Sequence, residues 1–516
     1  MDHHYCRLGA SHDLLVLIYI ARGLRGSGTN GNITKVIHLL IILSLIVVDA
    51  AIFIVLLMHI LLRRRGTSET RLAWVVFIIL IPYLGALAYL LVGGIYFGRV
   101  RHHRHISLHA NNAPNEQPDL EDLPGMEPRT PSPYRRVFTL AENLCPSDLL
   151  GGNHLDLEID SENFLKPLLE DIENATRNVH LLTYIYLADD TGRQVASALR
   201  AAAKRGVHCR VLVDSMGSRD FLRSDLSREM EADGVQVMEA LPASLFRITI
   251  ARIDLRNHRK IVVIDNKIGY VGSQNIADPS FAPKAKFAPW VDCMVRINGP
   301  AVHDLQELFL EDWFLETGET VEGLYEELPH VQQDGADVQI IASGPNLDHG
   351  SFTMVLQSCF HVASEEIILT TPYFVPDVAT ETALIAAARR GVATTLILPA
   401  RNDSRLVSLA SRSHYEDILR AGVRIYHFNA GLLHAKTLTV DRQLFMLGSA
   451  NLDRRSMELN FEVNMLGWNP DFAGQLRLLQ LSYQNDSTEI KGQEWLNAGW
   501  KRRLARNAAG MLSPLL

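Results

Sequence analysis

The sequence has few cysteines and no strong excess of charge of either sign. Its 516 residues include only five cysteines, which are scattered along the chain without a CxxC pair. Such cysteines indicate reduced thiols in a reducing compartment and argue against a disulfide framework or a zinc site. The formal net charge is −8, whereas a general nucleic-acid binder normally carries a strong basic excess. A chain of this length is long enough for two or three domains.

Two long apolar runs stand near the N-terminus. The first covers residues 36–62 and the second covers residues 72–97. Each run exceeds the roughly 20 residues that a helix needs to cross a bilayer. Buried helices of globular proteins seldom stay apolar on every face for so long. The sequence therefore predicts a transmembrane helical hairpin over 36–98, preceded by a loosely ordered extension over 1–35.

Basic residues around the two runs indicate how this hairpin is oriented. The loop between the runs carries Arg63, Arg64, Arg65 and Arg71, and the outer flanks carry Arg22, Arg25, Lys35, Arg99, Arg101 and Arg104. Because the cytoplasmic flanks of membrane helices are the more basic, six residues against four favour a cytoplasmic position for both ends and for the rest of the chain. Asp49 lies inside the first run, where an ionisable side chain serves either function or helix packing.

Residues 99–135 form a linker that is first basic and then rich in proline and acidic residues. The basic part, RHHRHISLH, is expected to lie against anionic lipid headgroups, and the remainder is expected to be extended. A second basic segment, EWLNAGWKRRLARNAAGMLSPLL, ends the chain. It mixes aromatic and aliphatic residues with arginines, so it is either an amphipathic helix on the membrane surface or an ordinary packed terminal helix.

After the linker the sequence repeats itself. The stretch LLTYIYLADDTGRQVASALRAAAKRGVHCRVLVD begins at Leu181, and the similar stretch LTTPYFVPDVATETALIAAARRGVATTLILP begins at Leu369. Each stretch reads as a buried strand, a short polar loop, a helix and a second strand, which is typical of α/β folds. The sequence therefore predicts two tandem α/β repeats, over 136–335 and over 336–516, the second with a C-terminal helix.

Each repeat contains the same motif with the same spacing. The two copies are HRKIVVIDNKIGYVGSQN and HAKTLTVDRQLFMLGSAN. Lysine follows histidine by two positions, aspartate follows it by seven, and Gly-Ser and asparagine come after. The residues of the first copy are His258, Lys260, Asp265, Ser273 and Asn275, and those of the second are His434, Lys436, Asp441, Ser449 and Asn451. One copy could arise by chance, but two copies at equivalent places of a repeat indicate a shared function.

These residue types suit the chemistry of a phosphodiester. One imidazole can attack phosphorus while the other protonates the leaving alkoxide and then deprotonates the acceptor. Two repeats that face each other across a pseudo-twofold axis can place the imidazoles on opposite sides of one phosphorus, and this scheme needs no metal. The groups suited to bind the phosphate oxygens are Lys260, Lys436, Ser273, Ser449, Asn275 and Asn451. Asp265 and Asp441 complete the candidate catalytic set, although their place at a turn favours a local structural role.

The doubled motif, HxKxxxxD followed by GSxN, resembles the signature of the phospholipase D superfamily. Other segments, including PYLGALAYLLVGGIYFGRVR, TPYFVPD and GSANLDRRSMELNFEVN, resemble the bacterial cardiolipin synthases of that superfamily. The resemblance begins near Lys35 and continues to the end of the chain. It implies two phospholipase D-like α/β repeats around a pseudo-twofold axis, preceded by a transmembrane helical hairpin in the bacterial cytoplasmic membrane.

The resemblance also implies an activity. Two molecules of phosphatidylglycerol would give cardiolipin and glycerol through a phosphatidyl-histidine intermediate, without a cofactor. By analogy His258 is the nucleophile and His434 the acid and base, although the near-symmetric motifs leave this assignment open. In the superfamily a carboxylate downstream of each motif orients each histidine, and Asp292 and Glu462 match these positions. The implied partners are phosphatidylglycerol and other membrane phospholipids, and a homo-oligomer is compatible with the sequence.

Other activities use the same histidines. A membrane-bound phospholipase D would pass the phosphatidyl group to water and release phosphatidic acid, and a phosphatidylserine synthase would take it from a CDP-linked lipid. Positioning of the acceptor and exclusion of water distinguish these reactions, and the motif does not. The apolar runs and the acidic total charge argue against a nuclease, and two complete motifs argue against a non-catalytic scaffold.

Overall fold

The computed structural model describes residues 29–62, 68–93, 101, 104, 125–242, 254–321, 330–347, 350–496 and 499–511. It divides the chain into two units, Met1–Gly94 and Ile95–Leu516. The predicted N-terminal extension up to residue 28, the basic loop 63–67 and most of the linker before residue 125 lie outside the described residues.

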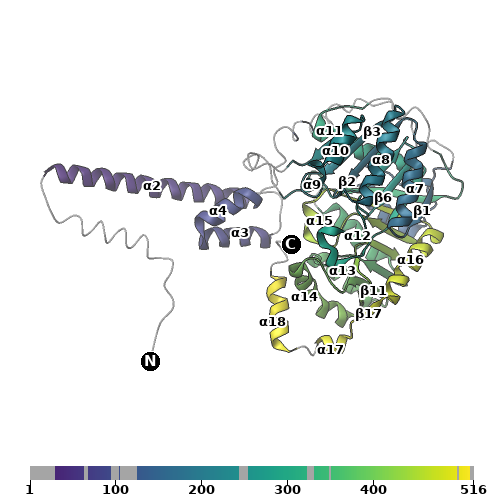
Figure 1. The fold of residues 1–516 in the computed structure, drawn as a ribbon. Helices are drawn as coiled ribbons and strands as arrows, with labels where there is room; N and C mark the ends of the chain where they lie inside the picture. The colour runs from purple at the N-terminus through teal and green to yellow at the C-terminus, as the bar shows by residue number, and fades with distance from the viewer. Residues whose placement is uncertain are drawn as a thin grey trace. The chain divides into compact units, whose positions relative to one another are not determined.

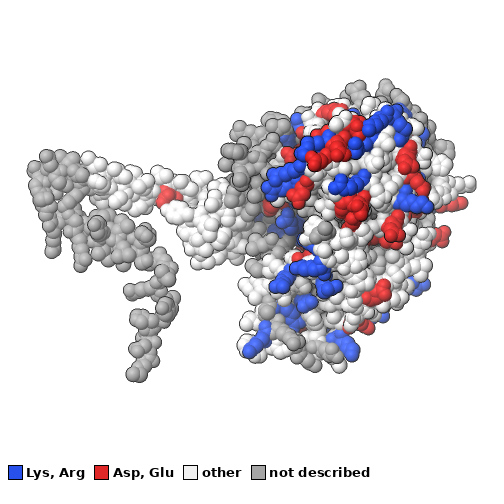
Figure 2. Space-filling model, in the orientation of Figure 1, with Lys and Arg blue, Asp and Glu red and all other residues white. Residues whose placement is uncertain are grey.

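The N-terminal unit is helical and apolar. Its elements are α2 (Thr29–Leu62), α3 (Ser68–Leu80), α4 (Pro82–Ala88) and a π-helical turn, η1 (Tyr89–Gly93). Within the described residues, one helix is long and apolar enough to cross a membrane, over Val36–Leu62. Its mean hydropathy is 3.1, and only 6% of its most apolar 18-residue stretch is buried inside the protein. Figure 2 shows its described surface as almost entirely uncharged.

The second apolar run does not form the single continuous helix that the sequence led us to expect. Helix α3 ends at Leu80, and α4 starts at Pro82. Proline lacks the N–H group that a helix interior requires, and its ring clashes with the preceding turn, so the run divides there. The second run therefore consists of two shorter helices, and the hairpin over 36–98 stays a prediction.

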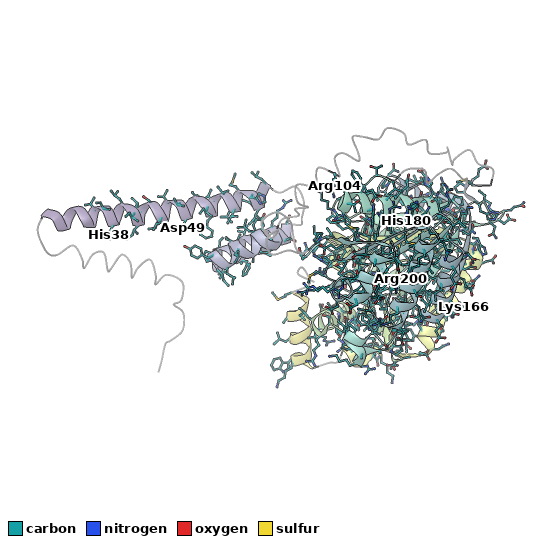
Figure 3. The ribbon with its side chains drawn as sticks, turned by 45° about the horizontal axis from the view of Figure 1, so that its top comes forward. His38, Asp49, Arg104, Lys166, His180 and Arg200 are labelled. Carbon is teal, nitrogen blue, oxygen red and sulfur yellow. The ribbon has the colours of Figure 1, made fainter. Side chains whose placement is uncertain are left out.

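Polar contacts join the helices of the N-terminal unit. The Tyr83 hydroxyl donates to Asp49 Oδ2 at 2.8 Å, and His59 Nδ1 lies 2.7 Å from the Tyr89 hydroxyl. Asp49 and His38 both lie on α2, where Figure 3 labels them. Because Asp49 accepts a hydrogen bond from α4, its contacts support the helix-packing role over a functional one.

The C-terminal unit is an α/β fold built on one sheet of 15 strands (Figure 1). The strands of its first half are β1 (Leu150–Glu158), β2 (Asn178–Thr183), β3 (His208–Asp214), β4 (Gln236–Ala240), β5 (Ile261–Ile264), β6 (Ile268–Gly272) and β8 (Met294–Asn298). Those of its second half are β9 (Ala336–Ser343), β10 (Glu366–Thr370), β11 (Ala393–Pro399), β12 (Arg424–Phe428), β14 (Thr437–Val440), β15 (Leu444–Gly448), β16 (Glu462–Trp468) and β17 (Ser487–Glu489). Two short strands, β7 (Trp290–Val291) and β13 (Leu432–Leu433), pair separately.

The order of the strands has the predicted internal symmetry. Outward from the β1–β9 pair at the centre, one side runs β8, β6, β5, β2, β3, β4, and the other runs β16, β15, β14, β10, β11, β12, ending with β17. In both halves the last three equivalent strands are parallel, and β5 and β14 run antiparallel to them. The prediction of two tandem α/β repeats related by a pseudo-twofold axis is confirmed.

Helices cover the sheet in both halves. Those of the first half are α7 (Ser161–Asn174), α8 (Asp190–Lys204), α9 (Arg219–Leu222), α10 (Asp225–Ala232), η4 (Ala282–Phe287) and α11 (Ala301–Thr317). Those of the second half are α12 (Ser351–Val362), α13 (Val378–Arg389), α14 (Arg405–Ala421), α15 (Arg454–Glu458), α16 (Pro470–Asn485), α17 (Gly492–Leu496) and α18 (Trp500–Gly510). Helix α18 packs along α14, which supports a packed terminal helix, although Trp500 and Leu504 remain exposed.

Equivalent residues start and end the equivalent helices α8 and α13. The side chain of Asp189 accepts from the backbone N–H of Gly192, and that of Asp377 accepts from Thr380, so each helix begins with an N-cap. Both helices end before a glycine with positive φ, which only glycine adopts without strain. The two repeats therefore match in their helix caps as well as in their strand order.

Helix α6 (Ser132–Glu142) packs away from its neighbours in sequence. Tyr134, Val137 and Phe138 are buried in the core of the second half, against residues of α12 and α13, although α6 precedes β1 in the chain. The segment just before the first repeat therefore completes the core of the second.

Candidate active site

The two motifs begin at equivalent places in the two halves of the sheet. His258 and Lys260 precede β5, and His434 and Lys436 precede β14. The backbone N–H of His258 donates to the Phe461 carbonyl at 2.8 Å, and that of His434 donates to the Val291 carbonyl at 2.7 Å. Each histidine is thus held by the backbone of the opposite half.

The candidate orienting carboxylates also cross between the halves. Glu462 Oε2 lies 2.8 Å from His258 Nδ1, and Asp292 Oδ1 lies 2.6 Å from His434 Nδ1. Both carboxylates are buried. Because each carboxylate holds the Nδ1 side of the ring, the Nε2 atom is left to face a substrate. Asp292 follows the first motif and Glu462 follows the second, so each contacts the histidine of the other repeat.

The two motif serines support these carboxylates and do not point to a free phosphate site. Ser273 Oγ donates to Asp292 Oδ1 at 2.6 Å, and Ser449 Oγ donates to Glu462 Oε2 at 2.5 Å. Each hydroxyl has its one proton committed in this way. These contacts favour a different role from the predicted phosphate binding: each serine holds the carboxylate that in turn holds a histidine.

The motif asparagines are less committed to the fold. Asn275 Oδ1 accepts from the backbone N–H of Ile185 at 3.1 Å, which leaves its Nδ2 for a ligand. In the described part of the chain, the buried Oδ1 of Asn451 has no hydrogen-bond partner. A buried acceptor without a partner is costly unless a donor from a ligand or water completes it. The Nδ2 of Asn275, a donor, suits a phosphate oxygen, whereas the Oδ1 of Asn451, an acceptor, suits a hydroxyl of the substrate or of water.

The two lysines lie deep in the site. Lys260 Nζ donates to the His258 carbonyl at 2.6 Å, and Lys436 Nζ donates to the His434 carbonyl at 2.5 Å. Burial lowers the pKa of Lys260 to about 7 and that of Lys436 to about 8. The charge of Lys436 lowers the pKa of Lys260 further, and both lysines lower the pKa values of His258 and His434. A bound anion would raise both pKa values and hold both lysines as cations.

Burial also lowers the pKa of both histidines. The pKa of His258 falls to about 4, because burial and the cations Lys260 and Lys436 outweigh the opposing effect of Glu462. The pKa of His434 shifts in the same direction for the same reasons, against the effect of Asp292. Without a bound anion both imidazoles are therefore neutral near pH 7, as a nucleophile must be. An anionic phosphate in the site would raise both pKa values and favour the protonated form that a general acid needs.

Two aromatic side chains in the site were missed by the sequence analysis. The Tyr184 ring packs edge-on against His258 with ring centroids 4.9 Å apart, and the Trp290 ring lies 4.7 Å from that of His434. The sequence offered one signal for them: Tyr184 directly follows the predicted strand of the first repeat, and Trp290 lies two residues before Asp292. Both imidazoles are buried beside these rings.

The motif aspartates lie at the other end of their strands. Asp265 and Asp441 adopt positive φ in tight turns after β5 and β14. Asp265 accepts backbone N–H groups of residues 176–178, and Asp441 accepts those of residues 364–366. These contacts support the structural role: both aspartates fix the hairpin turn to the start of the neighbouring strand.

Replacement of Asp441 by Asn should lower stability and leave the chemistry intact. Burial alone would raise the pKa of Asp441, but the amide bonds outweigh it and hold the pKa below its usual range. The stabilisation is therefore fully present above the unfolded-state pKa of about 3.9 and is lost as the pH falls through the folded-state pKa. We expect the variant to lose about 1–3 kcal/mol of unfolding free energy at pH 7, measured as a lower Tm in detergent.

The exposed Asp417 provides the control for this variant. Asp417→Asn should leave the Tm unchanged, and kcat should remain at the wild-type value in both variants. A large loss of kcat in folded Asp441→Asn protein would instead support the place of the aspartate in the catalytic set.

No group of three or more His, Cys, Asp or Glu side chains in the described ranges is arranged to hold a metal ion. The site is formed by two buried histidine–carboxylate pairs, two lysines and two amides.

Comparisons with known proteins agree with this geometry. A family model described as "Cardiolipin synthase, PLD-like domain" matches residues 168–313 and 356–478, and one described as "Phospholipase D-nuclease N-terminal" matches residues 51–94. Cardiolipin synthase A of Yersinia pseudotuberculosis is 36% identical, and that of Pectobacterium carotovorum is 37% identical; each match covers 89% of this chain and 95% of the relative.

A solved structure shares the fold. The crystal structure of phosphatidylserine synthase from Haemophilus influenzae superposes with a TM-score of 0.55 at 13% sequence identity, and the match covers 74% of this chain and 98% of that one. The exposed apolar helix α2 and the relatives together indicate membrane association. Because these matches cover most of the sequence and include both motifs, the chain belongs to the cardiolipin synthases of the phospholipase D superfamily.

Proposed function

We propose that the protein transfers the phosphatidyl group of one phosphatidylglycerol to another, giving cardiolipin and glycerol. The observation that carries this proposal is the pair of buried histidines, each oriented through Nδ1 by a carboxylate of the opposite half. Relatives named cardiolipin synthase A, which are 36–37% identical over 89% of the chain, support cardiolipin as the product.

In the first step His258 Nε2 attacks the phosphorus of the donor lipid. The bond from phosphorus to the glycerol oxygen breaks, and His434, which enters this step protonated at Nε2 beside the bound anionic phosphate, gives that proton to the departing glycerol. In the second step His434 takes the proton of a primary hydroxyl on the second phosphatidylglycerol, whose oxygen displaces His258 from phosphorus. One phosphodiester is thereby exchanged for another, and both histidines return to their starting state.

The remaining groups of the site would stabilise charge during these steps. Lys260 and Lys436 become fully cationic beside the phosphate, and the amides of Asn275 and Asn451 donate to its oxygens. Glu462 stabilises the positive charge that develops on His258, and Asp292 does the same for His434. The packing of Tyr184 and Trp290 on the imidazoles favours a lipid hydroxyl over water as acceptor.

We also propose that the N-terminal unit lies in the bacterial cytoplasmic membrane as a hairpin, with the α/β unit on the cytoplasmic side. The basic residues on the outer flanks support this orientation. The hydrogen bonds of Asp49 and His59 to tyrosines of the second apolar run support insertion of both runs together, since polar groups in a bilayer need partners.

Analysis of the products tests the proposed activity. Purified full-length protein in lipid vesicles is given phosphatidylglycerol alone, and lipids and free glycerol are quantified by mass spectrometry. We expect cardiolipin and glycerol in equal amounts. Phosphatidic acid without cardiolipin would show that water is the acceptor and that the protein is a phospholipase D. The same preparation with His427→Ala, an imidazole that bonds only Tyr415 in the described structure, should give the wild-type products.

A further inference from the structure

The basic segment after the N-terminal unit does not lie free for lipid headgroups where the structure describes it. Arg101 is only 8% exposed. Arg104 donates to the carbonyls of Leu315, Glu316 and Thr317, at the C-terminal end of α11, and Figure 3 labels it at the border of the α/β unit. For these two arginines the expectation of headgroup contact is wrong, because their guanidinium groups are bonded within the protein.

Arg101 reaches three side chains behind the first motif. Its guanidinium carbon lies 4.8 Å from the centre of the Phe461 ring. It is paired with Glu316, and its Nη2 lies 3.9 Å from Asp312 Oδ1. A desolvated cation on an aromatic face and between two carboxylates is tightly held.

Phe461 holds the backbone on both sides of Asn257, the residue before His258. Its carbonyl accepts from the His258 N–H at 2.8 Å, and its own N–H donates to the Arg256 carbonyl at 2.9 Å. The next residue along the chain is Glu462, which holds the His258 ring. A shift of Phe461 would therefore move the backbone and the ring of His258 together.

Asp312 fixes the two side chains that flank His258. Asp312 Oδ2 accepts from Asn257 Nδ2 at 2.9 Å and from Arg259 Nη1 at 2.7 Å. Arg259 also faces the Phe461 ring, at 5.5 Å from its centre. Arg101 thus contacts both groups that frame His258, one through its ring and the other through its charge.

The equivalent support of His434 is built differently. Its N–H and that of Ala435 both donate to the carbonyl of Val291, whose aliphatic side chain offers no ring for a cation. The arginine support therefore distinguishes the His258 side of an otherwise near-symmetric site.

We propose that Arg101 is a positioning residue for His258, acting through Phe461 and Asp312. It ties the segment that follows the apolar unit to the backbone of the nucleophile, so the catalytic geometry depends on the docking of this segment. The inference deepens the proposed function and rests on it, because it assumes that His258 attacks the phosphatidyl donor.

The test compares full-length Arg101→Ala with wild-type protein in phosphatidylglycerol vesicles. We expect kcat to fall about tenfold or more, as for other groups that orient a reacting residue, while KM stays unchanged because Arg101 does not touch the substrate. Added guanidinium should occupy the vacated site and restore part of kcat. Arg101→Lys should lie between the two, because a lysine keeps the charge but lacks the planar fork.

Arg210 provides the matched control. It is also 8% exposed in the same half, and it pairs with Glu319 and lies over Trp313. Arg210→Ala should lower the Tm, and added guanidinium should not increase the kcat of this variant. Wild-type kcat in folded Arg101→Ala protein, or a loss that guanidinium leaves unchanged while Arg101→Lys is fully active, would overturn the positioning role. Wild-type protein that makes no cardiolipin would instead overturn the proposed function, so the two failures are separable.

Discussion

Replacement of His258 or of His434 by Ala is expected to lower cardiolipin synthesis by more than about a thousandfold. Each imidazole is buried and held by one carboxylate, so its removal leaves the reacting phosphorus without its nucleophile or without its oriented proton donor. The measurement is the initial rate of cardiolipin formation from phosphatidylglycerol in vesicles. Substantial synthesis by either variant would contradict the paired-histidine mechanism.

A lipid with an activated leaving group separates the two roles. With phosphatidyl-p-nitrophenol the leaving group needs no proton, so His434→Ala should release a single burst of p-nitrophenol and then stop with the phosphatidyl group on His258. His258→Ala should give no burst, because the nucleophile is missing. The reverse pattern would exchange the two assignments, and His427→Ala should behave as wild type.

Replacement of Glu462 by Gln, or of Asp292 by Asn, is expected to lower kcat by about a hundredfold or more. The amide keeps the size of each side chain but removes the charge that fixes the tautomer and stabilises imidazolium. The serine hydroxyl would lose its anionic acceptor in the same variants. Burial would by itself raise the pKa of either carboxyl group, but the histidine contacts outweigh it and keep both pKa values low, so both are charged at working pH.

The crossed contacts make a specific prediction for these two variants. With phosphatidyl-p-nitrophenol, Glu462→Gln should slow the burst, because Glu462 contacts His258. Asp292→Asn should leave the burst intact and slow the steady phase, because Asp292 contacts His434. The opposite result would mean that each carboxylate serves the histidine of its own repeat. Ser273→Ala and Ser449→Ala should follow the same pattern with smaller losses.

The sequence predicted the features that repeat locally. Buried strands of β-branched residues, capped helices and the two motifs all follow from short-range patterns, so the tandem α/β repeats and the histidines and lysines of one site could be read from the chain. The spacing of Asp292 and Glu462 also marked them as candidates. Their roles stay predictions until the variants are measured.

The features that the sequence did not reveal depend on contacts between distant segments. Spacing within one motif says nothing about which histidine a carboxylate meets, because that depends on how the halves face each other. Ser273 and Ser449 were assigned to phosphate because a hydroxyl suits either partner, and only the fold brings a carboxylate within 2.6 Å of each. Pro82 was visible, but tertiary context decides whether a proline kinks or ends an apolar helix.

The packing of α6 has a consequence for the order of events on the ribosome. Val137 and Phe138 emerge early, but their partners in the core, such as Phe352, Phe360 and Leu384, are synthesised much later. At about 5–20 residues per second, this delay lasts on the order of tens of seconds. During that time the apolar face of the nascent α6 has no native surface to cover it. The first half can then fold before the second half is made, but α6 can pack into its native place only after the second half has been synthesised.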